Sequence, residues 1–260
     1  MTDQIPAAIY GPVRSWRLGS SLGVDLLCVD SICSFECVYC QLGKINRVTT
    51  EREIFVSTEK VLEDLQKSEW QKANVITFSG SGEPTLAKNL GEVIEKIKKL
   101  TRKPIVVLTN STLLHDAQVR RELLKADKIF CKLDAWSNDV LRRVDKPSEG
   151  ILLETIISGI FQLRQEFGGF LAIQTMILRP PNDLEIEKLA AILLLINADE
   201  VQLNLPTRPI PHEYFVETRG NAVESNSDYR QIKTISKDEL EKIRQKLSQL
   251  TNLPVITRYK

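Results

Sequence analysis

The stretch CSFECVYCQLG (residues 33–43) holds three of the five cysteines of this 260-residue chain. Cys33, Cys37 and Cys40 follow the spacing C-x3-C-x2-C, and the apolar run VDLLCV (24–29) precedes them. We interpret the run as a strand and the cysteines as part of the loop that follows it. In parallel α/β folds, the loops at the carboxyl ends of the strands build the active site. The three cysteines therefore mark a candidate active-site loop.

Three clustered thiols favour metal binding or catalysis over disulfides, because a chain of this length needs no stapling and its cysteine count is odd. A structural zinc site takes four ligands, and neither His115 nor His212 lies at a spacing that completes one. A [4Fe–4S] cluster normally takes four thiolates. Three thiolates leave one iron open to a small molecule, which a catalyst requires and an electron carrier does not.

Apolar runs alternate with amphipathic segments between residues 24 and 206. We predict strands at 24–29, 74–80, 104–110, 128–135, 170–178 and 200–206, with helices at 57–70, 88–100, 116–125, 149–166 and 183–196. This alternation predicts an α/β fold with a parallel sheet and right-handed crossovers. Strands that are apolar throughout, as these are, fit either a partial barrel or an open doubly wound sheet.

The pattern changes after residue 206. Residues 207–231 show little periodicity, so we predict a long loop that acts as a lid or cap, followed by a helix at 236–250 and a short strand at 254–259. We therefore expect a core at 1–206 and a C-terminal extension at 207–260 that packs on it.

The overall charge gives no sign of a polyanionic partner. The net charge is +1 and the pI is near 7.6, so contact with nucleic acid would need a local basic patch. The N-terminus lacks the basic and apolar regions of a signal peptide, and no apolar run approaches the length of a membrane span. We expect a cytoplasmic protein with no membrane partner.

The cysteine loop and four further segments resemble one known family. A C-x3-C-x2-C loop with an aromatic residue, here Tyr39, before the last cysteine is similar to the signature loop of the radical S-adenosylmethionine (SAM) superfamily. The similarity extends to its wyosine-synthase-like subgroup of single-domain proteins through the segments GPVRSWRLGSSLGVDLL (11–27), ITFSGSGEPTL (76–86), VVLTNSTLL (106–114) and VQLNLPTRP (201–209).

The resemblance implies a partial (βα)6 TIM-like barrel with parallel strands, capped by the C-terminal extension. It implies that Cys33, Cys37 and Cys40 are the catalytic residues and hold a site-differentiated [4Fe–4S] cluster whose open iron binds SAM. Reductive cleavage of SAM would give a 5′-deoxyadenosyl radical that abstracts hydrogen from a substrate. An external low-potential electron donor, such as flavodoxin or ferredoxin, would be a partner.

The resemblance leaves the substrate open. The subgroup suggests tRNA-base modification, and a small molecule or peptide is the rival substrate class. The archaeal wyosine enzymes carry a second cluster on cysteines upstream of the signature loop, whereas only Cys28 lies upstream here, so a second cluster is not expected. Two other functions stay open: an iron–sulfur electron-transfer or cluster-carrier protein without SAM cleavage, and a zinc-binding module.

The segment GSGEPTL (80–86) follows the second predicted strand. It resembles the Gly-Gly-Glu-type motif that binds the methionine amino group of SAM in the superfamily. The matching residues are Gly80, Gly82, Glu83 and Pro84. Glycine permits close approach of a backbone to a ligand, although an ordinary strand-to-helix turn has a similar composition.

Polar residues on the later strands complete the predicted cofactor site: Asn110, Ser111, Asp134 and Gln174. The first three lie at strand ends and match ribose contacts of the superfamily, with helix capping as the alternative for Asn110 and Asp134. Gln174 faces the same side of the sheet as other polar groups, which need a cofactor, substrate or water as partner. We expect Tyr39 to pack near the adenine of SAM.

Five basic residues near the loop are candidates to receive a phosphate or carboxylate, with a solvated rim as the alternative: Arg14, Arg17, Lys44, Arg47 and Arg52. Arg208, His212 and Tyr214 lie on the predicted lid. Cys28 and Cys131 are expected to be small buried hydrophobic residues.

Overall fold

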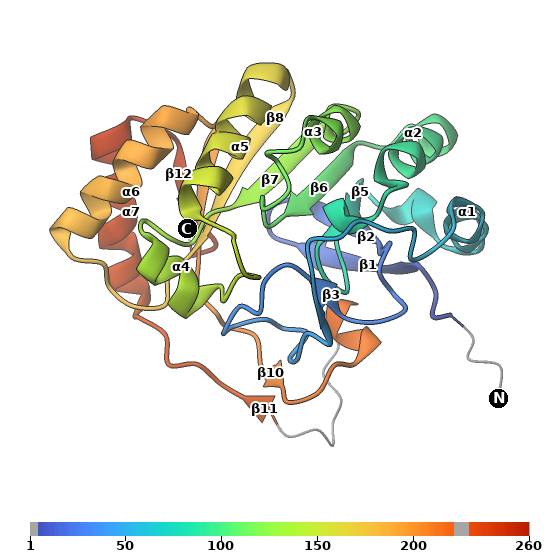
Figure 1. The fold of residues 1–260 in the computed structure, drawn as a ribbon, viewed down its shortest axis with the longest axis horizontal. Helices are drawn as coiled ribbons and strands as arrows, with labels where there is room; N and C mark the ends of the chain where they lie inside the picture. The colour runs from blue at the N-terminus through green and yellow to red at the C-terminus, as the bar shows by residue number, and fades with distance from the viewer. Residues whose placement is uncertain (1–4, 221–228, 260) are drawn as a thin grey trace.

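The computed structural model describes residues 5–220 and 229–259. A curved eight-stranded sheet lies at its centre, with helices over the outer face (Figure 1). In spatial order, its strands are β1 (Ile9–Ser15), β2 (Gly19–Val24), β5 (Val75–Phe78), β6 (Ile105–Thr109), β7 (Lys128–Lys132), β8 (Phe170–Met176), β9 (Glu200–Asn204) and β12 (Val255–Thr257). All neighbours from β2 to β12 are parallel, and β1 is antiparallel to β2. The predicted α/β fold with parallel strands is confirmed.

The sheet is buried on both faces, as its continuously apolar strands require. The main core lies between the sheet and the helices. A separate apolar cluster, formed by Val75, Val106, Phe130 and Ala172, lies on the opposite, inner face. Because side chains alternate between faces, the residues two and four positions later on these strands continue along the inner face toward the carboxyl ends.

The helices in the described residues are α1 (Thr58–Lys67), α2 (Leu90–Thr101), α3 (Ala117–Leu123), α4 (Asn138–Val144), α5 (Leu153–Glu166), α6 (Asp183–Ile196) and α7 (Lys237–Thr251). The bounds of α6 agree with the prediction because both ends carry strong signals. Asn182 and Glu185 form a capping box at its start, and Asn197 ends it in the left-handed conformation. None of these helices has the length and apolar content of a membrane span.

The predicted strand at 24–29 is wrong. β2 ends at Val24, and residues 26–29 form a turn. Asp25 stabilises this turn, because its buried carboxylate accepts hydrogen bonds from the backbone N–H of Leu27 (3.0 Å) and of Ser81 (3.1 Å). The apolar run was misleading because Leu26 and Leu27 are buried in the core outside any strand.

The predicted helix at 149–166 begins later, at Leu153, and α4 was not predicted. α4 has only seven residues, and its buried face consists of Val140 and Leu141. Two apolar residues give too little periodicity to indicate a helix.

The C-terminal extension divides into two parts. α7 packs beside α6, and β12 pairs in parallel with β9, so the end of the chain completes the sheet. The part before α7 includes the small sheet of β10 (Ile210–Pro211) and β11 (Tyr229–Arg230), with a 3-10 helix at Val216–Gly220. This second part lies beside the loop that follows β2 (Figure 1).

Candidate active site

The cysteine loop leaves the sheet after β2 and folds on itself through the pairing of β3 (Ile32–Cys33) with β4 (Arg47–Val48). The backbone N–H of Ile32 donates to the carbonyl of Ser81 (2.8 Å), and its carbonyl accepts from the N–H of Glu83 (3.1 Å). The cysteine loop and the glycine loop therefore lie in direct contact beyond the carboxyl ends of β2 and β5.

Gly80 and Gly82 allow this contact between the two loops. Their φ angles are +142° and +152°, which side chains rarely permit. A β-carbon on Gly82 would overlap the carbonyl of Ile32, and one on Gly80 would overlap the carboxyl group of Asp25. The close approach predicted for a ligand is thus made, in this structure, by the chain itself.

Glu83 joins the ends of β5 and β6. It is buried, and its Oε1 accepts hydrogen bonds from the hydroxyls of Thr85 (2.6 Å) and Thr109 (2.7 Å), while Oε2 accepts from the N–H of Asn110 (2.6 Å). Burial raises the pKa of Glu83, and these hydrogen bonds partly offset that effect. Pro84 begins a short 3-10 helix directly after it.

Asn110 orients the first cysteine. Its Nδ2 donates to the hydroxyl of Ser34 (2.8 Å) and contacts Cys33 Sγ at 3.5 Å, while its Oδ1 accepts from the N–H of Thr112 (3.0 Å). Ser111 follows with a φ of +74° and donates its hydroxyl to the carbonyl of Lys132 (3.3 Å). These two predicted residues therefore lie at the cysteine loop, where their side chains already make contacts within the protein.

The segment 144–148, at the end of α4, supports the cysteine loop along its length. The carbonyl of Asp145 accepts from the N–H of Glu36 (3.1 Å), and the carbonyl of Val144 accepts from the N–H of Val38 (2.9 Å). Residue 148 donates its N–H to the carbonyl of residue 34 (2.9 Å). The positions of the cysteines thus depend on a segment more than 100 residues away in the sequence.

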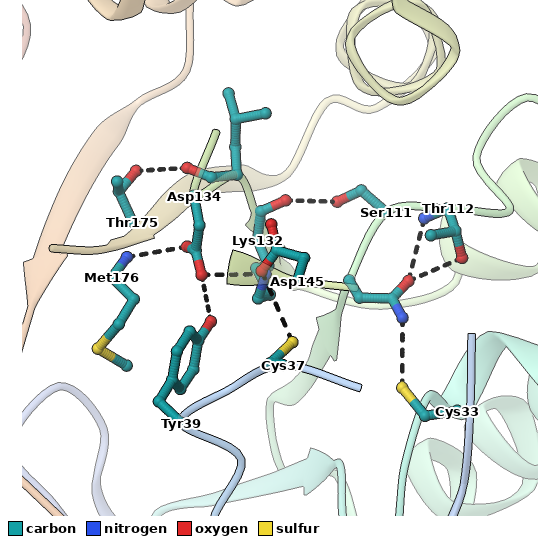
Figure 2. A network of polar contacts seen from close by, with 12 residues as sticks. Cys33, Cys37, Tyr39, Ser111, Thr112, Lys132, Asp134, Asp145, Thr175 and Met176 are labelled. Atoms are coloured by element: carbon teal, nitrogen blue, oxygen red, sulfur yellow. Dashed lines mark hydrogen bonds and ion pairs between the residues drawn. The ribbon is translucent and has the colours of Figure 1, made fainter. Parts of the chain in front are cut away.

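Figure 2 shows a polar network at the end of β7, beside the cysteine loop. The Nζ of Lys132 forms ion pairs with Asp134 Oδ2 (3.0 Å) and with Asp145 Oδ1. Tyr39 donates its hydroxyl to Asp134, and Cys37 Sγ lies 3.6 Å from Asp145 Oδ1. Asp134 was predicted to contact ribose and Tyr39 to pack near adenine; in the structure they hydrogen bond to each other.

The three loop cysteines are free thiols and are half-buried. Burial raises the pKa of Cys33 to about 12, and it raises the pKa of Cys37 and of Cys40 as well, although Lys132 lowers the pKa of Cys37 in part. Thiols in this environment keep their protons until a metal displaces them.

The donor set fits a [4Fe–4S] cluster with one open iron. It consists of three free thiols on one loop, with no disulfide to compete for them. The sulfurs of Cys33 and Cys37 now contact Asn110 and Asp145, and in residues 5–220 and 229–259 no three Cys, His, Asp or Glu side chains are gathered closely enough to hold a metal ion.

Gln174 shares the inner face of the sheet with polar residues of β9. Its Nε2 donates to Gln202 Oε1 (2.9 Å), so each of these two side chains has a hydrogen-bond partner on the neighbouring strand. Nearby, Arg17 donates from Nη1 to Asn204 Oδ1 (3.2 Å), while its buried Nε has no hydrogen-bond partner among the described residues. On the inner face of the sheet, polar side chains therefore lie closer to the carboxyl ends of the strands than the apolar cluster does.

The predicted lid contacts both loops. Tyr214 shares a hydrogen bond with the hydroxyl of Ser81 (2.6 Å), and Arg219 forms a buried ion pair with Asp25 (2.9 Å), which also binds Ser81. Gln41 of the cysteine loop donates to the carbonyl of residue 218 (3.0 Å). A cavity of about 210 Å³ lies between the lid and the loop, lined among others by Cys37, Lys44, Lys146, His212 and Arg230.

The basic residues predicted near the mouth do not all face it. Arg47 is paired with Glu53, and Arg52 is paired with Glu122, so each guanidinium already has an acidic partner within the chain. Glu122 lies 70 residues from Arg52, so spacing gave no sign of that pair, whereas Glu53 lies only six residues from Arg47. Cys28 and Cys131 are buried, as predicted.

The sequence prediction missed Lys132 and Asp145. Lys132 carried a signal, because a lysine inside the apolar run KIFCKLDA (128–135) needs a partner once the strand is buried. Asp145 carried none, since its contact with the cysteine loop depends on the tertiary fold.

The family model described as "Radical SAM superfamily" matches residues 29–193. A UPF0026 protein of Synechocystis sp. is 49% identical over 251 residues, which are 95% of this chain and 95% of that protein. A UPF0026 protein of Methanocaldococcus jannaschii is 34% identical over 79% of this chain, and the aligned region is 65% of that protein's length.

Solved structures share the fold at low sequence identity. Streptococcus suis SuiB has a TM-score of 0.60 and 15% identity, covering 88% of this chain and 48% of SuiB, and it has also been solved bound to SAM. TsrM from Kitasatospora setae, solved with cobalamin and a [4Fe–4S] cluster bound, has a TM-score of 0.50 and 14% identity, covering 75% of this chain and 38% of TsrM. This chain thus spans about half of SuiB and less of TsrM, and the likeness shows the partial TIM-like barrel fold.

Proposed function

This chain belongs to the radical SAM superfamily, and from that premise we propose that it is a radical SAM enzyme with a single [4Fe–4S] cluster held by Cys33, Cys37 and Cys40. Held by these three cysteines, such a cluster would supply the electron for reductive cleavage of SAM, the source of a 5′-deoxyadenosyl radical for hydrogen abstraction. One observation carries the proposal: three free thiols share one loop at the carboxyl edge of the parallel sheet, inside the region that matches the family.

The residues around the loop would bind and orient SAM. We propose as contacts the residues that the motifs indicate: Tyr39, Gly80, Gly82, Glu83, Pro84, Asn110, Ser111, Asp134 and Gln174. Because the carboxylates of Glu83 and Asp134 already accept several hydrogen bonds, these two would act mainly by fixing the loops that meet SAM. The structures of SuiB with SAM and of TsrM with a cluster support this use of the fold.

We propose that the enzyme acts on an unidentified substrate and takes electrons from an external low-potential donor such as flavodoxin or ferredoxin. We also propose that it is located in the cytoplasm. The resemblance to the wyosine-synthase-like subgroup favours a tRNA base as the substrate, and a small molecule or peptide is the rival class. A gel-shift assay with tRNA would separate them, because binding to phosphates weakens steeply as salt rises.

The test is an assay for 5′-deoxyadenosine. The protein would be purified without oxygen, reconstituted with iron and sulfide, and mixed with SAM and dithionite. We expect 5′-deoxyadenosine from the wild type and none from Cys37→Ala. Cys131→Ala is the matched control, because it removes a buried thiol outside the loop and should keep the activity.

Other outcomes point to the alternatives. A fully loaded cluster that is reduced without cleaving SAM, with and without tRNA, would indicate an electron-transfer or cluster-carrier protein. A colourless protein that holds zinc and no iron would indicate a zinc-binding module. Loss of activity in Cys131→Ala as well as in Cys37→Ala would mean that the assay reports folding rather than the loop.

A further inference from the structure

Lys132 places a positive charge next to the cysteine loop. It is the last residue of β7, and only 18% of its side chain is exposed. Its Nζ lies 4.9 Å from the ring centre of Phe35 and 5.7 Å from that of Tyr39, which are both residues of the loop. An ammonium group over aromatic rings is an attractive contact that strengthens as water is excluded.

Two buried carboxylates hold this ammonium in place. Asp134 and Asp145 both contact Lys132 Nζ, and the side chain of each is only 1% exposed. The Oδ2 of Asp145 is buried and has no hydrogen-bond partner in the described part of the chain. Charges with so little solvent around them interact more strongly than charges at the surface.

The pair of Lys132 and Asp145 is in contact with one of the cysteines. Asp145 Oδ1 accepts from Lys132 Nζ and also from Cys37 Sγ (3.6 Å), so both groups meet at one oxygen (Figure 2). The backbone carbonyl of Asp145 also accepts from the N–H of Glu36, next to Cys37. The charged pair therefore has a fixed position relative to this cysteine.

We propose that the opposite charges of Lys132 and Asp145 set the reduction potential of the cluster. The inference rests on the proposed function, because it requires a cluster at Cys37. Reduction adds one negative charge, so a nearby cation favours the reduced cluster and a nearby anion disfavours it. Lys132 would raise the potential and Asp145 would lower it.

The test measures the midpoint potential of the reconstituted cluster without SAM. An anaerobic redox titration at pH 8.5, followed by the EPR signal of the reduced cluster, would compare Lys132→Met and Asp145→Asn with the wild type at equal iron content. We expect Lys132→Met to shift the midpoint to lower potential and Asp145→Asn to shift it to higher potential. Lys132→Arg keeps the charge and should restore a value near the wild type.

Lys128→Met is the matched control. Lys128 lies on the same strand and the same face, and its Nζ also lies over an aromatic ring, that of Phe170 (5.1 Å). It is four residues from Lys132, about 13 Å along a strand, so its removal should leave the potential unchanged.

Shifts in the same direction for Lys132→Met and Asp145→Asn, or no shift in either, would overturn the inference, because a general loosening of the loop does not depend on the sign of the charge. If Lys132→Met loads no iron, Asp145→Asn and Lys132→Arg decide the question. A wild-type protein that loads no cluster would instead contradict the proposed function.

Discussion

At the scale of single residues, Gly82 is the position where the site tolerates least change. Its φ of +152° and its contact with the carbonyl of Ile32 both exclude a β-carbon. We predict that Gly82→Ala separates the cysteine and glycine loops and lowers the free energy of unfolding by about 3 kcal/mol, from backbone strain and steric overlap.

Urea denaturation and iron content after reconstitution would check this prediction. Gly168→Ala is the control, because a β-carbon there meets nothing within 4 Å, and its effect should stay within about 0.5 kcal/mol. Equal stability and equal iron content in the two variants would show that the loops do not depend on their close contact.

Glu83 gives a second prediction at this scale. In Glu83→Gln, one carboxylate oxygen becomes an NH2 group that faces a donor, either the N–H of Asn110 or the hydroxyls of Thr85 and Thr109. We expect a loss of about 1–3 kcal/mol in the free energy of unfolding. Glu63→Gln, on the exposed side of α1, should have little effect in the same denaturation experiment.

The raised pKa of Glu83 also predicts a pH dependence. Between the ordinary pKa of 4.5 and the raised pKa of Glu83 in the folded state, the folded protein binds more of this proton than the unfolded chain does. The contribution of Glu83 to stability therefore falls as the pH rises from 4.5 through the folded pKa. Subtracting the stability profile of Glu83→Gln from that of the wild type should give a difference that falls with pH, and a difference that rises would contradict the burial effect.

At the scale of elements, a buried ion pair helps to attach the predicted lid to the site. Arg219 and Asp25 have side chains 7% and 1% exposed, and Arg219 also donates to the carbonyl of residue 7 (2.6 Å). Arg219→Ala leaves the carboxylate of Asp25 buried without its cation, at a cost of about 3 kcal/mol. We predict that the lid opens more often and that protease Glu-C cuts after Glu213 and Glu217 about tenfold faster or more.

Arg179→Ala tests whether any lost ion pair has this effect. Arg179 pairs with Glu185 but is half-exposed, so its loss should change stability by less than about 1 kcal/mol and leave the lid as it was. Unchanged cleavage in Arg219→Ala would mean that other contacts, such as that of Tyr214 with Ser81, suffice to hold the lid.

The elements also show how far the sequence predicts the structure. α6 could be located to the residue because its capping box and its left-handed end are local signals. The strand placed at 24–29 failed because Leu26 and Leu27 are buried by tertiary packing, which periodicity does not register. The cysteine and glycine motifs located the site, whereas the support from 144–148 depends on contacts across the whole fold.

At the scale of the whole molecule, the sheet ends with a strand from the C-terminal extension. β12 pairs with β9, and Leu247 of α7 is fully buried in the core that lies between sheet and helices. If the extension folds as one unit with the barrel, Leu247→Ala should lower the stability of the entire chain, by about 2–5 kcal/mol for a buried leucine. Leu250→Ala, on the exposed side of the same helix, should have little effect.

Tryptophan fluorescence can show whether the extension unfolds together with the barrel or alone, because the three tryptophans, Trp16, Trp70 and Trp136, all precede residue 206. If the molecule unfolds cooperatively, the tryptophan transition in urea shifts by the same amount as the helical signal from circular dichroism. If Leu247→Ala moved only the helical signal, the extension would be unfolding alone, and the lid would then be attached to a part of the chain that is not required to hold the barrel together.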